Sequence, residues 1–147
     1  MRRWIIALAL LVSLAPAAVA GRIHARIEGP GRDGLTYTAR TYSCDEHDVL
    51  EPWASAEGVV DGKRGSVLIR LTATSQHGVY QFPRTWPREG LWMIRLALGH
   101  PLAPATVAML RADGTVRNNK FFLGSDGYEE CRRTLRKALH SKSGDDC

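Results

Sequence analysis

The chain has 147 residues, a formal net charge of +5 and 44% hydrophobic residues, which suits a globular protein with one core. Its basic residues are scattered instead of forming a stripe that could follow a phosphate backbone. We therefore expect no nucleic-acid partner.

A secretory signal peptide is predicted at residues 1–20. The chain starts with basic residues at 2–3, continues with an apolar run at 4–12 and reaches a small-residue cleavage site at 18–20. A transmembrane helix needs about 20 apolar residues, and this run is shorter. We expect a mature chain from Gly21 that is periplasmic or secreted, with no stable membrane insertion after cleavage.

Short strand patterns separated by turn residues fill the middle of the chain. Asp61-Gly62 and Asp113-Gly114 are hairpin signals. The strand patterns lie at residues 22–28, 35–44, 54–60, 66–72, 78–83, 91–98, 105–111 and 115–123. No helical pattern crosses between them, so residues 21–123 are predicted to form an all-β domain. It would be an immunoglobulin-like antiparallel β-sandwich of about seven strands.

The predicted core centres on residues 78–98, where two strand patterns meet across a corner rich in Pro and Gly. In the second pattern Trp92, Ile94 and Leu96 share one face, and Met93, Arg95 and Ala97 share the other. The residues predicted to form the core are Tyr80, Phe82, Trp92, Ile94 and Leu96. Trp53 and Trp86, each beside a proline, are expected to plug the ends of the sandwich.

The apolar period changes to that of a helix near the C-terminus. Tyr128, Cys131, Leu135 and Leu139 recur at helical spacing. We predict an amphipathic helix at 124–140 that docks across an end or an open edge of the sandwich. A flexible tail is expected at residues 141–147.

Three cysteines allow one intramolecular disulfide in an oxidising compartment. Pairing Cys44 with Cys131 would fasten the helix to the sheet across a long loop, which is worth roughly 4 kcal/mol in the loop-entropy account. Cys147 would then be free or would pair with another molecule. The pair Cys131 with Cys147 remains open.

A metal site is the alternative for the polar residues. His24, His47 and His77, with the methionines, are ligand types that copper accepts, but no two histidines are closely spaced. The densest group of ligand-capable residues is Cys44 to Asp48, for which a solvated acidic loop is the favoured explanation, because the ligand types are right but their spacing is not. We therefore expect no cofactor, with copper as the alternative.

Residues 54–64, 78–80 and 86–92 together resemble the YtkA-like family of small exported β-sandwich domains, over roughly residues 54–114. The resemblance implies a sandwich in which glycines turn the chain and aromatic residues fill the core. That family is similar in shape to periplasmic copper-resistance and oxidase-maturation domains. This chain lacks their Met-rich loop and closely spaced His pair.

None of the common catalytic motifs occurs in the sequence, so no catalytic residues are predicted. The sequence favours an exported non-catalytic binding or accessory module of the bacterial cell envelope, with another envelope protein as its partner. Periplasmic copper binding or metal trafficking is the alternative. A third hypothesis is a structural role in an envelope complex through an exposed sheet edge or Cys147. The sequence does not distinguish this role from that of a binding or accessory module.

Overall fold

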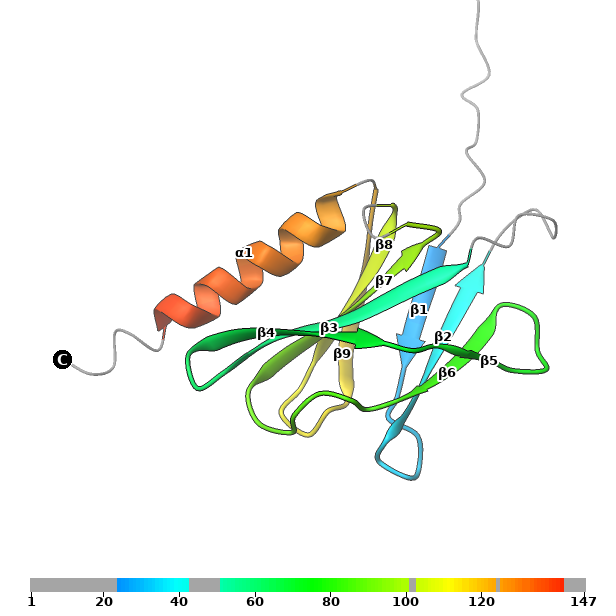
Figure 1. Cartoon of the computed structure of the whole chain (residues 1–147), viewed down its shortest axis with the longest axis horizontal. Coiled ribbons are helices and arrows are strands. Elements are labelled where there is room, and N and C mark those ends of the chain that lie inside the picture. Colours follow the sequence, from blue (N-terminus) through cyan, green and yellow to red (C-terminus); the bar gives the residue numbers. More distant parts are fainter. Residues whose placement is uncertain (1–23, 43–50, 101–102, 124, 142–147) are drawn as a thin grey trace, which may run out of the picture.

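In the computed structural model, which describes residues 24–42, 51–100, 103–123 and 125–141, two antiparallel sheets are stacked and a helix lies against one of them (Figure 1). The first sheet has the strand order β1-β2-β6-β5 and the second has the order β4-β3-β7-β8-β9. The elements are β1 His24–Glu28, β2 Thr36–Tyr42, β3 Pro52–Val60, β4 Lys63–Ile69, β5 Thr72–Ala73, β6 Val79–Pro83, β7 Leu91–Leu98, β8 Ala105–Leu110, β9 Val116–Phe122 and α1 Asp126–Ser141.

The strand order is the Greek-key order of an immunoglobulin domain, with β9 added beside the last strand of the second sheet. The predicted all-β sandwich with a C-terminal helix is therefore confirmed. The described part of the chain has nine strands instead of about seven. One reason is that residues 66–72, expected as one strand, are divided between two sheets, because the chain crosses over between Ile69 and Thr72.

A tight turn joins β3 to β4, as the Asp-Gly pair predicts. Asp61 and Gly62 have φ angles of 49° and 73°, and a type I′ hairpin turn requires positive φ at both central positions. The register therefore starts at the pair Val60 and Lys63 and runs the length of β4. The turn leaves β4 as the outer strand of its sheet.

The core between the sheets contains the residues expected there. Phe82, Trp92, Ile94 and Leu96 are buried, and Tyr80 is partly buried against the same cluster. Trp86 also belongs to this core, whereas Trp53 does not, because it lies on the outer face of the second sheet over Arg95. The expectation that Trp53 plugs an end of the sandwich was wrong.

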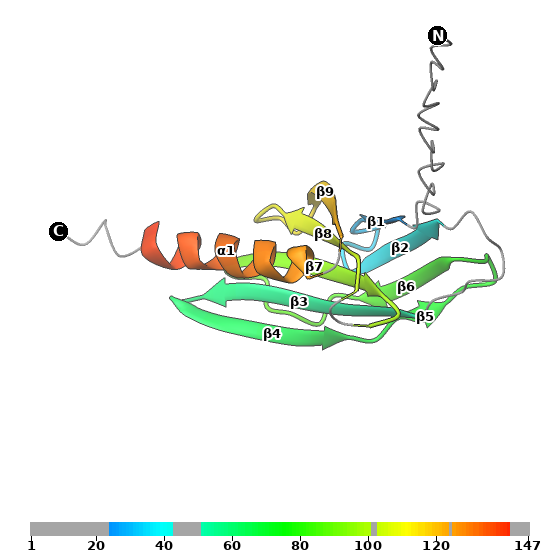
Figure 2. The same ribbon diagram turned by 90° about the horizontal axis from the view of Figure 1, so that it is seen from above.

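Helix α1 covers the outer face of the five-stranded sheet, which corrects the expectation that it lies across an end or open edge (Figure 2). The physical reason is that β7 is apolar on both faces. Met93 and Ala97 point away from the core between the sheets and are fully buried. Cys131 and Leu135 of the helix join Met93 in a second apolar cluster. The described residues thus form three layers with two apolar cores between them.

No helix within the described ranges is both long and apolar enough to cross a bilayer.

Candidate functional site

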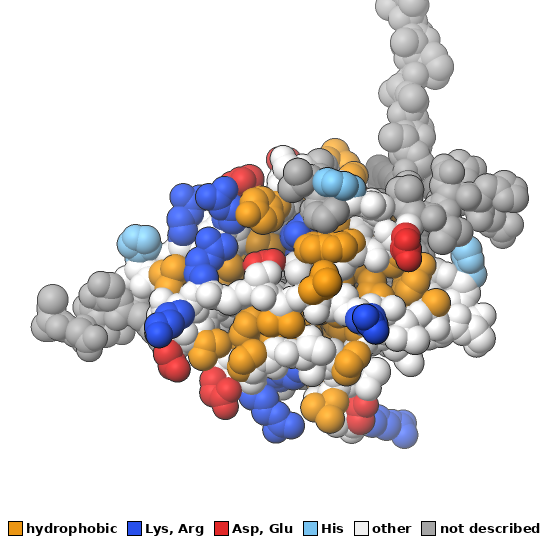
Figure 3. All heavy atoms as spheres, viewed as in Figure 1, with side chains coloured by type: hydrophobic (Ala, Val, Ile, Leu, Met, Phe, Trp, Pro, Cys, Tyr) orange, Lys and Arg blue, Asp and Glu red, His pale blue; other side chains and the backbone are white. Residues whose placement is uncertain are grey.

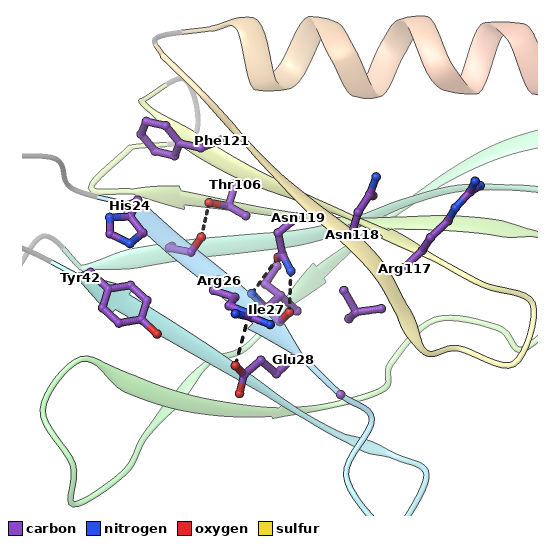
Figure 4. A pocket seen from close by; sticks show the side chains of 13 residues that line it. His24, Arg26, Ile27, Glu28, Tyr42, Thr106, Arg117, Asn118, Asn119 and Phe121 are labelled. Carbon is purple, nitrogen blue, oxygen red and sulfur yellow. Dashed lines mark hydrogen bonds and ion pairs between the residues drawn. The ribbon is translucent and has the colours of Figure 1, made fainter.

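A groove of about 670 Å³ runs between β1, the edge of the first sheet, and β9, the edge of the second (Figure 4). We call it the β1–β9 groove. Strands from the beginning and the end of the sandwich form it, so it exists only after the two sheets have stacked. Among the residues that line it are His24, Arg26, Glu28, Tyr42, Thr106, Arg117, Asn118, Asn119 and Phe121.

The floor of the β1–β9 groove consists of two side chains and one backbone N–H that bind the backbone of β1 and of the residue after it. The amide of Asn119 accepts from the Ile27 N–H at 2.9 Å and donates to the Ile27 carbonyl at 3.0 Å, as a neighbouring strand would. Thr106 Oγ1 donates to the Ala25 carbonyl at 2.6 Å, and the Val116 N–H donates to the Gly29 carbonyl at 3.0 Å.

Three of these bonds occupy outer backbone groups of β1 that another strand would need, namely the Ala25 carbonyl and both the N–H and the carbonyl of Ile27. A partner chain therefore cannot simply add a strand at β1. If the hypothesis of an exposed sheet edge applies to this fold, β4 is a better position than β1, because β4 is the edge strand of the five-stranded sheet on the side away from the groove.

The rims of the β1–β9 groove are aromatic at one end and polar at the other. His24 stacks on Tyr42, with ring centroids 4.6 Å apart, and Phe121 is 41% exposed. Arg117 and Asn118 lie toward the other end, and both side chains are exposed (Figure 4). A groove with exposed aromatic rings at one end and amide and guanidinium donors at the other can bind a partner through both apolar contacts and hydrogen bonds.

A second groove of about 540 Å³ lies on the outer face of the five-stranded sheet, between β3, β4 and the beginning of helix α1. We call it the helix groove. Its lining residues come from three strands and the helix, and comprise Trp53, Glu57, Arg64, Gly65, Ser66, Arg95 and Tyr128.

Arg95 is the central residue of the helix groove and is only 3% exposed. Its guanidinium carbon lies 4.7 Å from the centroid of the Trp53 ring and 5.5 Å from that of Tyr128. Arginines are rarely this buried, because removing a charge from water is costly. Its position in the middle of β7, with apolar neighbours on both sides, makes it the least expected buried side chain of the sheet.

Glu57 supplies the negative charge in the same groove. One of its carboxylate oxygens accepts hydrogen bonds from Ser55 Oγ at 3.0 Å and Ser66 Oγ at 2.9 Å. Ser55 lies opposite Arg95 in the register of β3 and β7. The strands therefore place two hydroxyls, one carboxylate and one guanidinium on the same patch of the outer sheet face.

Cys131 lies near this patch but is not suited to nucleophilic chemistry. Burial raises the pKa of its thiol to about 12, while the positive charge of Arg95 lowers it and the negative charge of Glu57 raises it. Since the thiolate is the reactive form, the thiol is unreactive at neutral pH. Cys131 forms no disulfide with any residue that the structure describes, and both Cys44 and Cys147 lie outside the described residues.

The structure describes two of the three histidines that were predicted as possible copper ligands, His24 and His77. His47 lies outside the described residues. His24 pairs with Tyr42, and the Thr41 N–H donates to the carbonyl of Gly78, the residue after His77. The two histidines therefore lie at the same end of the first sheet, on opposite sides of β2. Two strand spacings separate their backbones, which is roughly 10 Å. Within the described part, no three potential metal-ligating residues cluster.

Sequence reasoning missed both Asn119 and Arg95. An asparagine in a polar strand gives no sign that it will bind a strand far away in the sequence. Arg95 did give a signal, because it is the one charge in the apolar run 91–98. A charge within a strand that is apolar on both faces indicates a specific environment.

A scan against protein-family models found no match, and searches of curated proteins and of solved structures found none either. The assignment to a YtkA-like family therefore stays a prediction.

Proposed function

We propose that the protein is an exported, non-catalytic binding or accessory module of the bacterial cell envelope, and that the β1–β9 groove receives a segment of another envelope protein. The observation that carries the proposal is the construction of this groove. Its floor is held by Asn119 and Thr106, while Phe121 and Tyr42 leave about two fifths of their surface exposed beside it.

Exposed apolar side chains that gather at one place on a surface are typical of interaction sites. At the other end of the same groove, Arg117 and Asn118 supply donors that are also exposed (Figure 4). Protein interfaces combine such aromatic anchors with a polar rim. The rigid floor would let the groove bind without first being ordered, which lowers the entropic cost of binding.

Site-specific photocrosslinking tests this proposal in the cells that produce the protein. A photoreactive phenylalanine analogue would replace Phe121 in the groove, and in a second strain it would replace Arg136, an exposed residue of the helix. We expect a discrete crosslinked product from position 121 and none from position 136. Equal products from both positions, or none from position 121, would contradict the proposal.

Copper binding remains the alternative, and one observation favours it. His24 and His77 lie at the same end of the first sheet, and the segment that contains His47 follows directly after Tyr42 in the sequence. Titration of the mature, untagged chain with Cu(I) and Cu(II), followed by metal analysis after desalting, tests it. One retained equivalent that is lost in His47→Ala would favour copper handling over the partner-binding proposal.

A further inference from the structure

The two described sheets have four edge strands, and three of these edges are protected against pairing with another chain. The side chains of Asn119 and Thr106 occupy outer backbone groups of β1. Strand β5 has only two residues, and the register of β9 shifts between Met109 and Leu110 of β8. Strand β4 has seven residues, and its register with β3 runs without a shift. It is therefore the one long and regular edge among the described strands.

Every second residue of β4 directs its backbone groups away from the sheet. In a hairpin with a two-residue turn, the residues that flank the turn form a hydrogen-bonded pair, and such pairs then alternate with non-hydrogen-bonded ones. The flanking pair is Val60 and Lys63, so the odd-numbered residues of β4 bond to β3. The N–H and carbonyl groups of Arg64, Ser66 and Leu68 therefore point outward. Within the described ranges, no backbone hydrogen bond outside the strand ladders involves these six groups.

The edge of β4 is accessible to a partner. All residues of the strand except Val67 and Ile69 are exposed, and Leu68 has 67% of its surface exposed. In Figure 2, β4 is the outermost strand on its side of the molecule. Figure 3 looks onto this side and shows apolar side chains gathered there, with Lys and Arg side chains to both sides of them. A strand paired with β4 would cover part of the exposed surface of Leu68.

Positive charge lies on both sides of Leu68 along the chain. Residues 63–70 contain three basic residues and no acidic one. Arg64 shares the outer face of the sheet with Leu68, and Arg70 follows directly after the strand and is exposed. If two copies paired antiparallel through all six outward groups, Arg64 of one copy would lie diagonally across from Arg70 of the other, roughly 7–8 Å away. The charges therefore oppose a second copy and favour an acidic strand.

We propose that β4 binds an extended acidic segment of another protein, which pairs with it as a further strand of the sheet. Backbone hydrogen bonds to Arg64, Ser66 and Leu68 would hold the segment. Acidic side chains opposite Lys63, Arg64 and Arg70, with an apolar side chain opposite Leu68, would give specificity. Strand β4 and the β1–β9 groove lie at opposite edges of the five-stranded sheet, so this proposal does not depend on the function proposed for the groove.

Amide hydrogen exchange on the complete mature chain, residues 21–147, tests the proposal. The probe is an acetylated and amidated peptide, Glu-Thr-Val-Thr-Thr-Thr-Glu-Glu, which in antiparallel pairing places its glutamates opposite the three basic residues and its valine opposite Leu68. At millimolar concentration it should slow exchange of the N–H groups of Arg64, Ser66 and Leu68. The N–H groups of Gly65 and Val67 already bond to β3, so their exchange should change little. The same peptide with lysine in place of glutamate should slow none of them.

Variants locate the binding on the edge. Ser66→Pro removes one outward N–H and leaves the bonds to β3 in place, and proline is tolerated on edge strands. It should abolish the slowing at Arg64 and Leu68. The matched control Ser66→Ala also loses the hydroxyl bond to Glu57 but keeps the N–H, and should bind like the wild type. Arg64→Gln should weaken binding about two- to fivefold, as expected for one exposed charge; if Ser66→Pro does not fold, this variant still decides.

Three results would overturn the proposal. The first is that the acidic peptide leaves exchange at Arg64, Ser66 and Leu68 unchanged. The second is equal slowing by the lysine peptide, because the edge would then not select acidic strands. The third is slow exchange of these N–H groups without any peptide that becomes slower as the protein concentration rises, because a second copy of the chain would then occupy the edge.

Discussion

Replacing Asn119 with aspartate tests how the sandwich is closed on its open side. The side-chain amide bonds both the N–H and the carbonyl of Ile27, at 2.9 and 3.0 Å. An aspartate has nearly the same shape, but its ionised carboxylate can only accept. Asn119→Asp therefore loses the bond to the Ile27 carbonyl and turns a negative charge toward it. A part-buried carbonyl left without its donor costs about 1–3 kcal/mol of unfolding free energy.

The penalty of Asn119→Asp should depend on pH in a defined direction. A carbonyl facing the new carboxyl disfavours its ionised form, so the pKa in the folded state should be raised above the ordinary value of about 3.9. The neutral acid can donate to Ile27 as the amide does. The destabilisation should therefore be complete at about pH 7 and fade as the pH falls through the raised pKa toward about 4.

Urea unfolding of wild type and variant at these two pH values measures the effect. The matched control is Asn118→Asp, which makes the same change on the same strand at an exposed position. It should change the unfolding free energy by no more than about 0.5 kcal/mol. Equal losses in Asn119→Asp and Asn118→Asp, or a penalty for Asn119→Asp that does not shrink at low pH, would refute this account of the closure.

Three other outcomes follow from the packing. Leu135→Ala, which empties a fully buried position between the helix and the sheet, should cost about 2–5 kcal/mol in chemical unfolding, and a loss below 1 kcal/mol would mean that the helix is not docked as described. Gly58→Ala would place a Cβ atom 2.3 Å from the Trp92 ring, and thermal unfolding should show a loss of about 1–3 kcal/mol or more. In the matched control Gly65→Ala the new Cβ would lie 3.5 Å from that ring, so the same measurement should show no comparable loss. Cys131, in a variant without the other two cysteines, should resist iodoacetamide in the native state at about pH 8 and react once unfolded. Because the pKa of this thiol is raised from 9.0 to about 12, its contribution to stability should be present below pH 9 and lost as the pH rises toward 12; fast native alkylation would contradict this.

The alternation in residues 91–98 predicted which side chains of β7 face the core between the sheets. Trp92, Ile94 and Leu96 are buried there. The same pattern also showed that Met93 and Ala97 leave the other face apolar, yet the expected position of the helix was wrong. An amphipathic helix shows that it must bury one stripe, but its sequence does not say against which surface.

Arg95 illustrates the same limit at the level of one side chain. The alternation in residues 91–98 predicted that Arg95 shares a face with Met93 and Ala97. This prediction is confirmed, because all three side chains lie on the outer face of the five-stranded sheet. What surrounds it could not be foreseen. Trp53 comes from β3 and meets Arg95 when β3 pairs with β7, whereas Tyr128 comes from the helix and meets Arg95 only after the helix has docked.

By itself the sequence determined the strands, the tight turn at Asp61-Gly62 and the C-terminal helix. Periodicity and turn chemistry depend on residues that are close along the chain, so a local pattern suffices to indicate them. Only the tertiary structure decided the two grooves. The bond between Ile27 and Asn119 joins residues 92 positions apart, and no local preference encodes such a contact, because it forms only when the edges of two separate sheets come together.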